Sequence, residues 1–115
     1  MSIPQNFLAL DLGAESGRAV LGQFDGERIQ LTEIHRFPNG PVRLPDGLHW
    51  DILRLWSELR RGIALAVREH GPDLISIGID TWAVDFGLLD RFGDLISNPY
   101  HSRDGRTDGM MDEAF

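Results

Sequence analysis

The sequence predicts an α/β domain with a mixed sheet, and two apolar runs with a helical segment between them carry this prediction. FLALD at 7–11 and DLISIGID at 73–80 are short, largely apolar and end in an aspartate, as expected for buried strands. The helix between them makes a crossover connection that can place the second strand parallel to the first in one sheet.

The first run opens an antiparallel meander of three strands. RAVLGQF at 18–24 contains β-branched and aromatic residues, and ERIQLTEIHRF at 27–37 follows with a similar character. Asp25–Gly26 stands between these two runs. Asp-Gly in such a place is a strong hairpin signal, because a type I′ turn requires positive φ at both central residues.

A helix is predicted after a loop. PNGPVRLPDG at 38–47 is dense in proline, glycine and asparagine, which indicates a loop. Asp51 is a suitable N-cap for the helix, and Gly71–Pro72 is a typical helix end. Spacings of three and four place one apolar set on the face expected to be buried: Ile52, Trp56, Leu59, Ile63 and Val67. Farther on, residues 84–97 are predicted to form a hairpin about Arg91–Gly93.

Length and composition indicate one small domain with its own core, since 42% of the 115 residues are hydrophobic. The formal net charge of −7 argues against nucleic acid or an anionic membrane as a main partner. Because the chain has no cysteine, it has neither a disulfide nor a thiolate metal site. We interpret His35 and His49 as surface or packing residues, because they lack the spacing of metal ligands. With neither a signal peptide nor a long apolar run, we expect a cytoplasmic protein. The ending RTDGMMDEAF resembles the first turn of a helix, so we expect a fragment.

The octapeptide DLGAESGR, which begins at Asp11, combines groups suited to holding a phosphate. Gly13 and Gly17 permit left-handed backbone and a close approach, so that consecutive N–H groups can converge on an anion. Ser16 adds a hydroxyl donor and Arg18 a positive charge, and a carboxylate at a strand end suits Mg²⁺. The octapeptide is not a Walker A loop, which needs a lysine after the second glycine. A glycine-rich hairpin turn with a solvated arginine explains the same residues.

Two later segments carry polar groups that suit a ligand. In GIDTWAVDFGLLD at 78–90, Asp80 ends a predicted strand, where ligands bind in α/β sheets. Trp82 follows beside polar side chains, and this combination suits a sugar because its C–H faces pack on aromatic rings. The alternative is a core tryptophan beside a turn-capping aspartate. NPYHSRDGRTDGM at 98–110 is a polar loop, which fits either a ligand-binding loop or a charge-balanced connector.

Five segments, taken in order, resemble the N-terminal part of the rhamnulokinases, a branch of the FGGY carbohydrate kinases: ALDLGAESGR, IHRFPNGPV, LHWDILRLW, IGIDTWAVDFGLLD and NPYHSRDGRTDGM. The similarity extends from about Phe7 to Met110. The resemblance implies a ribonuclease-H-like (actin-like ATPase) fold. Residues 1–115 would form the N-terminal part of its first domain, and the C-terminal domain would be absent.

The resemblance also implies ATP-dependent transfer of phosphate to the 1-hydroxyl of L-rhamnulose, with Mg²⁺. Asp11 would help to position the metal. The first ATP phosphate loop would consist of Ala14, Glu15, Ser16, Gly17 and Arg18, and the sugar site would be lined by Thr81, Trp82, Ala83 and Asp85. Glu15 stands where a serine is frequent in the family, and Ala83 where a glycine is expected. No catalytic base is assigned, because in this family the base belongs to the second domain.

Other functions stay open at the level of sequence. A family kinase that acts on another ketose or polyol would share most of these motifs. A ribonuclease-H-like nuclease would use Asp11, Asp80 and Asp85 to bind two metal ions, although the acidic charge counts against it. A non-catalytic sugar- or nucleotide-binding module would keep the scaffold alone. Apolar surface left uncovered in a fragment is expected to promote self-association.

Overall fold

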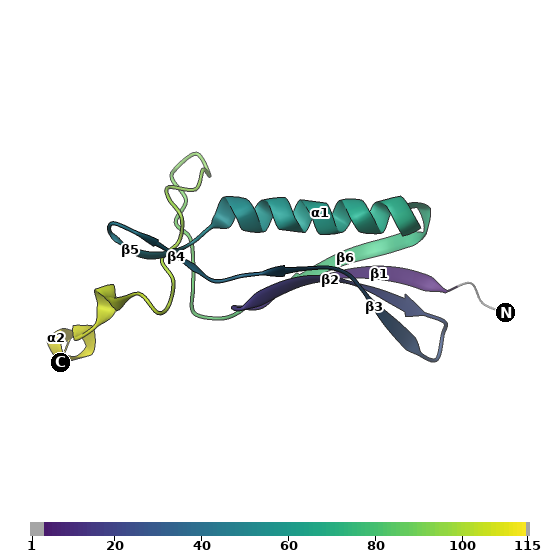
Figure 1. Cartoon of the computed structure of the whole chain (residues 1–115), viewed down its shortest axis with the longest axis horizontal. Helices are drawn as coiled ribbons and strands as arrows, with labels where there is room; N and C mark the ends of the chain where they lie inside the picture. The colour runs from purple at the N-terminus through teal and green to yellow at the C-terminus, as the bar shows by residue number, and fades with distance from the viewer. Residues whose placement is uncertain (1–3, 115) are drawn as a thin grey trace. The chain divides into compact units, whose positions relative to one another are not determined.

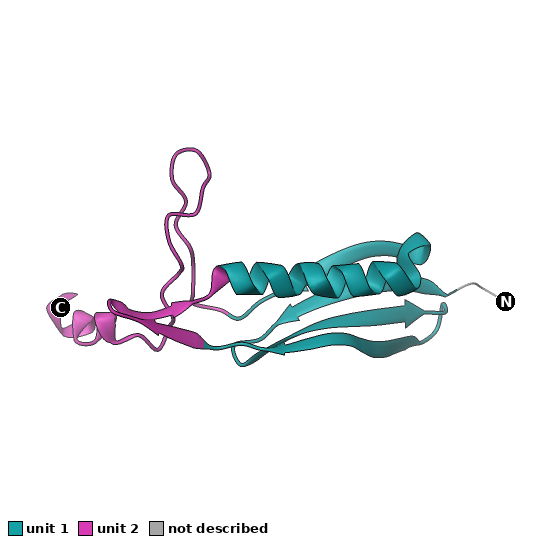
Figure 2. Cartoon of the chain, turned by 45° about the horizontal axis from the view of Figure 1, so that its top comes forward, with its two compact units in different colours: residues 1–40, 53–82 teal, residues 41–52, 83–115 magenta. Residues whose placement is uncertain are grey.

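The computed structural model describes residues 4–114, and the chain divides into two compact units. Unit 1 comprises the residues up to 40 together with 53–82, and unit 2 comprises 41–52 together with the residues from 83 onward (Figure 2).

Unit 1 is built on a four-stranded mixed sheet in the order β3-β2-β1-β6 (Figure 1). Its strands are β1 (Gln5–Leu12), β2 (Ser16–Phe24), β3 (Ile29–Pro38) and β6 (Leu74–Asp80). β2 pairs antiparallel with both β1 and β3, and β6 lies parallel to β1. The predicted meander and the predicted parallel strand are therefore confirmed.

The helix α1 (Ile52–His70) packs on this sheet and forms the core with it. Ala66 is fully buried in a cluster with Leu8, Leu10 and Ala19 of the sheet. Gly62 lies where the helix comes closest, because a Cβ at this position would be 2.8 Å from the Cβ of Ala19. After the helix, a short 3₁₀ turn, η1 (Gly71–Asp73), leads into β6.

The buried stripe of α1 is rotated from the predicted one. The buried residues are Leu55, Gly62 and Ala66, whereas Trp56 is 60% exposed and Val67 is 49% exposed. Small side chains at 62 and 66 let the helix backbone approach the sheet closely, and close packing favours that stripe over a bulkier one. The prediction was therefore wrong for Trp56 and Val67, while the other three predicted positions are partly buried.

The connection from β2 to β3 is a hairpin as predicted, but its turn is not type I′. The Asp25 carboxylate accepts hydrogen bonds from the N–H groups of Glu27 at 2.9 Å and Arg28 at 2.8 Å. Gly26 has a φ of 105°, while Asp25 is not among the described residues with positive φ. The aspartate side chain thus takes the place of a second left-handed residue in reversing the chain.

Unit 2 contains a hairpin where a loop was predicted. β4 (Pro41–Leu44) pairs antiparallel with β5 (Gly47–Trp50), and Gly47 at the turn has a φ of 140°. Two backbone hydrogen bonds of 2.9 Å also join β5 to residues 99 and 101. The loop prediction was wrong because these long-range bonds stabilise a pairing that the local proline and glycine content disfavours.

The remainder of unit 2 is largely irregular. Residues 84–97 form the predicted hairpin in outline, with an isolated bridge between Leu89 and Leu95. A 3₁₀ turn, η2 (Gly105–Thr107), and the short helix α2 (Met110–Ala114) follow. No helix in the described part of the chain is long and apolar enough to cross a membrane.

Candidate functional site

The turn between β1 and β2 is held by hydrogen bonds at its base. The Gly13 N–H donates to the Ser16 carbonyl at 2.9 Å. Asn39, at the end of β3, donates its backbone N–H to the Glu15 carbonyl and its side-chain amide to the Gly13 carbonyl, both at 2.9 Å. Ala14 and Glu15 stay exposed at the tip. A turn fixed in this way presents its tip to a ligand without first having to become ordered.

The two glycines of this turn do not adopt the left-handed backbone that the sequence analysis allowed for them. The glycines with positive φ among the described residues are at 26, 47, 93 and 109, so neither Gly13 nor Gly17 is left-handed. A Cβ at position 13 would lie 2.8 Å from the Ser16 carbonyl oxygen, and one at position 17 would lie 2.1 Å from Cζ of Phe37. Both glycines are therefore explained by the close approach that the sequence analysis also allowed for, and not by left-handed backbone.

Asp11 and Asp80 are paired at the ends of β1 and β6 by the parallel register. The Arg18 guanidinium donates to the Asp11 carboxylate, from Nε at 3.2 Å and from Nη2 at 2.5 Å. These bonds are the main cause of the lowered pKa of Asp11, and a hydrogen bond with Asp80 adds to it. The pKa of Asp80 is raised, chiefly because its carboxyl shares that hydrogen bond with Asp11. Two carboxyl groups in this arrangement favour either a shared proton or a bound cation.

These side chains border a hollow of about 370 Å³ on the sheet, whose other borders include Ala9, Val20 and Leu31. Within residues 4–114, no three histidine, aspartate or glutamate side chains gather into a complete metal centre. The two carboxyl groups nevertheless fit Mg²⁺, which is commonly held by one or two carboxylates while water and phosphate oxygens complete its shell. The hollow therefore has the donors for a metal–phosphate group.

Arg36 is a candidate site residue that the sequence reasoning missed. In the β2–β3 register it lies opposite Arg18, and its Nη1 is 3.4 Å from the Ser16 hydroxyl oxygen. Its Nη2 also pairs with the Glu33 carboxylate at 2.8 Å. The signal for finding it was the predicted meander, because cross-strand partners lie side by side on one face of a sheet. Two guanidinium groups thus stand at the base of the turn.

In unit 2, Asp85 is held beside the aromatic core of that unit. The indole N–H of Trp50, a residue only 2% exposed, donates to the Asp85 carboxylate at 2.7 Å. Val84 precedes it with a φ of 73°, which is unusual for a β-branched residue and typical of functional sites. Both residues line a cavity of about 460 Å³, whose other walls include Tyr100 and Arg106.

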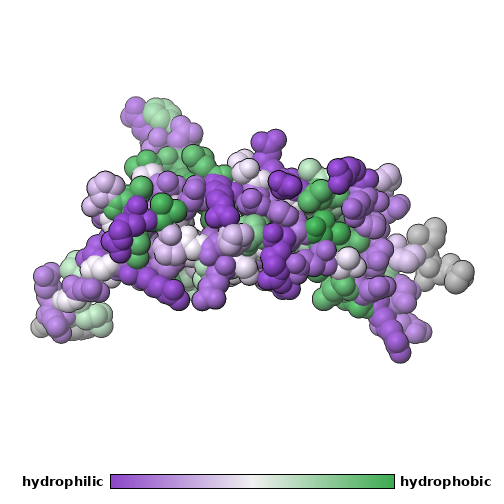
Figure 3. Space-filling model, in the orientation of Figure 1, coloured by the Kyte–Doolittle hydropathy of each residue, from purple (hydrophilic) through white to green (hydrophobic). Residues whose placement is uncertain are grey.

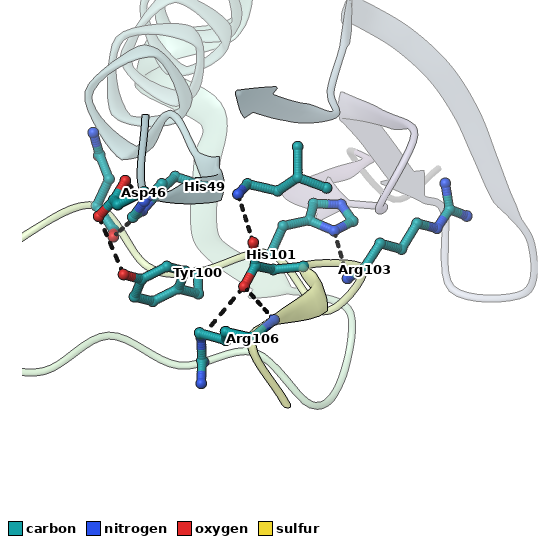
Figure 4. Close-up of polar contacts among 9 residues, drawn as sticks. Asp46, His49, Tyr100, His101, Arg103 and Arg106 are labelled. Atoms are coloured by element: carbon teal, nitrogen blue, oxygen red, sulfur yellow. Dashed lines mark hydrogen bonds and ion pairs between the residues drawn. The ribbon is translucent and has the colours of Figure 1, made fainter. Parts of the chain in front are cut away.

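A network of hydrogen bonds connects residues of this cavity wall with β5 (Figure 4). Asp46 accepts from the His49 ring at 2.8 Å and from the Tyr100 hydroxyl at 3.1 Å. Asp104 accepts from the N–H groups of Leu48 at 2.8 Å and of residue 106 at 2.9 Å. The interpretation of His49 as a surface or packing residue missed these contacts, because its partners lie up to about fifty positions away in the sequence.

The predicted sugar-site residues fall in both units. Thr81 and Trp82 end unit 1, where the Thr81 hydroxyl donates to the carbonyl of the next residue at 3.0 Å. Ala83 and Asp85 begin the second part of unit 2, and Asp85 borders the cavity. The predicted metal ligand Asp11 meets the predicted phosphate-loop residue Arg18 in unit 1. The site residues thus form two groups, one in each unit.

Comparison with known proteins gives relatives over nearly the whole chain. The rhamnulokinase of Oceanobacillus iheyensis is 47% identical over 108 residues, which is 94% of this chain. Those of Bacteroides thetaiotaomicron and Halalkalibacterium halodurans are 45% identical over 111 residues and 46% identical over 107 residues. The chain spans 22–23% of the length of these relatives. No family model matches it.

Solved structures support the fold. The chain superimposes with a TM-score of 0.77 on a gluconate kinase and 0.76 on a xylulose kinase, both from Lactobacillus acidophilus. Each match covers at least 96% of this chain and 22% of the solved chain, at 12% sequence identity. The predicted fold class is confirmed by these neighbours.

Proposed function

We propose that this chain, a relative of the rhamnulokinases in the FGGY carbohydrate kinase family, supplies part of a site for phosphoryl transfer from ATP to the 1-hydroxyl of L-rhamnulose. The observation that carries the proposal is the group formed by Asp11, Arg18 and Asp80 beside the β1–β2 turn. It combines carboxyl oxygens for a divalent cation with a guanidinium for phosphate. The similarity to rhamnulokinases favours L-rhamnulose over other ketoses.

In this proposal residues 14–18 contact the phosphates of ATP. Phosphoryl transfer requires alignment of the phosphate and neutralisation of the charge on its oxygens. Arg18 supplies one positive charge, the Ser16 hydroxyl supplies a hydrogen-bond donor, and Arg36 adds a second charge close to that hydroxyl. A Mg²⁺ ion held by Asp11 would add further positive charge at the phosphate oxygens. Glu15, exposed at the tip, can point its carboxylate into solvent.

The sugar is proposed to contact Thr81, Trp82, Ala83 and Asp85. The cavity beside Asp85 is of a size that admits a small ligand and is lined by both polar and aromatic groups. The Asp85 carboxylate, oriented by the Trp50 indole, accepts hydrogen bonds from sugar hydroxyls in this proposal. A ring such as that of Tyr100 suits the C–H face of a sugar.

The general base that takes the proton from the 1-hydroxyl is proposed to lie outside this chain. We infer that residues 1–115 are the N-terminal part of an actin-like ATPase domain, since the relatives are about four times as long. The pKa of Asp11 is lowered by Arg18, which makes this carboxylate a poor base and a good cation ligand. In this proposal Asp11 therefore binds and orients the reactants and does not accept the proton.

Nuclear magnetic resonance of the isotope-labelled chain tests the phosphate site. Addition of Mg-ATP is expected to shift the amide signals of residues 13–18 most strongly. Arg18→Gln removes charge-assisted hydrogen bonds worth about 1.5–3 kcal/mol, so it is expected to weaken binding by roughly tenfold or more. The matched control is Arg28→Gln in the exposed β2–β3 turn, which should bind as the wild type does. Equal affinity of the two variants, or shifts concentrated elsewhere, would contradict the proposal.

We also propose that the chain self-associates through its edge strand β6. Ile75, Ile77 and Ile79 are 55%, 48% and 59% exposed on this strand, and apolar patches are visible on the face shown in Figure 3. An apolar, unpaired strand edge is a common site of association. Sedimentation is expected to show concentration-dependent oligomers that Ile77→Lys suppresses. Phe92→Lys, at a residue of similar hydrophobicity and 74% exposure, is the control that should leave them unchanged.

A further inference from the structure

The ring of His49 lies between two hydrogen-bond acceptors. Nδ1 is 2.9 Å from the carbonyl oxygen of Asn98, and Nε2 is 2.8 Å from a carboxylate oxygen of Asp46. His49 is only 4% exposed, so solvent has little access to either nitrogen. A neutral imidazole has one donor and one acceptor nitrogen, so it would leave a lone pair facing an oxygen. The doubly protonated ring satisfies both contacts.

The charged groups around the ring favour the same form. The hydrogen bond from His49 is the main cause of the lowered pKa of Asp46, which keeps this carboxylate ionised. The pKa of His49 is raised, first by the carbonyl of residue 98, then by Asp46, with a smaller attraction from Asp104. The Tyr100 ring lies against the imidazole with centroids 4.3 Å apart, and Arg106 covers that tyrosine at 4.3 Å. Arg106 thus adds a positive charge to this packing, and its Nε lies 3.8 Å from the Asp104 carboxylate.

The same contacts connect His49 to the cavity. Asp46 uses its second oxygen to accept from the Tyr100 hydroxyl, so one carboxylate links the imidazole to a cavity wall. Arg106, stacked on Tyr100, forms a further part of that wall. Backbone hydrogen bonds to residues 99 and 101 and the Asp104 contact with Leu48 also join this segment to β5. The hydrogen bonds of His49 are the part of this attachment that changes with protonation.

We propose that His49 is a positioning residue that, in its doubly protonated form, holds residues 98–107 against β5 and so sets Tyr100 and Arg106 in the wall of the Asp85 cavity. The ligand that this inference assigns to the cavity, L-rhamnulose, rests on the function proposed above. Deprotonation of His49 breaks one of its two contacts and loosens the wall. If the charged form alone is competent, the apparent dissociation constant rises toward tenfold per pH unit above the pKa of His49.

The test begins with the wild-type chain and needs no ligand. A titration followed by nuclear magnetic resonance, from about pH 5 to pH 9, reads the protonation of both His49 nitrogens and the amide signals of residues 98–107. Both nitrogens are expected to be protonated at the acidic end, and these amide signals should shift at the same pH at which His49 loses a proton. A neutral His49 throughout the range, or amide signals that do not follow its titration, would overturn the inference.

Calorimetry with L-rhamnulose over the same pH range, on a polypeptide as long as the curated relatives, supplies the second arm. The wild type and the control His70→Gln, a histidine of unit 1, should bind less tightly as pH rises, whereas His49→Gln should bind weakly with little pH dependence. A pH-independent affinity of the wild type refutes the positioning role and leaves the proposed sugar site standing. If the wild type binds no L-rhamnulose while residues 98–107 still titrate with His49, the sugar assignment fails and the positioning role stands. Should His49→Gln fail to fold, the titration and the calorimetry of the wild type still test the positioning role of His49.

Discussion

Replacement of Gly17 by alanine is expected to destabilise the chain through one identifiable contact. A Cβ at this position would lie 2.1, 2.6 and 2.7 Å from three atoms of the Phe37 ring. Phe37 is 4% exposed and packs beside His35 with ring centroids 5.8 Å apart, so the ring has little room to withdraw. Gly17 does not have positive φ, so alanine introduces no backbone strain and the effect is purely steric.

The magnitude follows from two routes by which the clash can be relieved. An ordinary carbon–carbon contact is about 3.5–4.0 Å, so the ring must move by roughly 1.4 Å or more. Overpacking with displacement of this kind costs about 1–3 kcal/mol. Expulsion of the ring into water costs a similar amount, about 1.5–3 kcal/mol for a phenylalanine. Either route gives a loss of about 1–3 kcal/mol in the free energy of unfolding.

Denaturant unfolding followed by circular dichroism measures this loss, and a double-mutant cycle identifies its cause. Phe37→Leu shortens the clashing side chain, so Gly17→Ala should cost less than about 0.5 kcal/mol in that background. If Gly17→Ala costs the same with and without the Phe37 ring, the steric explanation fails. A single variant as stable as the wild type would rule it out as well.

Leu55→Ala is expected to cost about 2–5 kcal/mol in unfolding experiments because Leu55 is 5% exposed, whereas Leu53→Ala, at a residue 74% exposed, should stay within about 0.5 kcal/mol of the wild type. Arg36→Gln should weaken Mg-ATP binding in calorimetry by about two- to tenfold, the equivalent of one ordinary hydrogen bond; unchanged affinity would remove Arg36 from the site. The pKa of His49 is raised, so the stability that His49 contributes is full below its unfolded pKa and is lost as pH rises through its folded pKa. The pKa of Asp46 is lowered, so the stability that Asp46 contributes is present above its unfolded pKa and is lost as pH falls through its folded pKa. In unfolding experiments at a series of pH values, Asp46→Asn should therefore move the loss of stability at high pH to a lower pH. If the pH of that loss does not change, Asp46 does not raise the pKa of His49.

The sheet could be predicted from sequence because its signals are local. The apolar runs, the Asp25–Gly26 turn and the helical periodicity each specify an element without reference to distant residues. The face of α1 was less predictable. Whether Trp56 or Ala66 faces the sheet depends on how closely two surfaces can pack, and periodicity alone does not contain that information.

The residues of the candidate site could likewise be predicted only where local signals bring them together. Asp11 and Arg18 could be placed together because a hairpin pairs them, and the same register would have revealed Arg36. The β4–β5 hairpin carried a second Asp-Gly signal, at 46–47, within a segment whose prolines indicated a loop. The network of His49 was hidden because its partner at residue 98 is distant in sequence and only the folded unit brings them together.

We propose that this chain belongs to a site that phosphorylates L-rhamnulose. The most direct measurement is an assay of a polypeptide as long as the curated relatives, with ATP, Mg²⁺ and L-rhamnulose, in which ADP and the sugar phosphate are both quantified. We expect ADP and a product phosphorylated at the 1-hydroxyl to form in equal amounts. The absence of product from L-rhamnulose, alongside good turnover of another ketose, would contradict it.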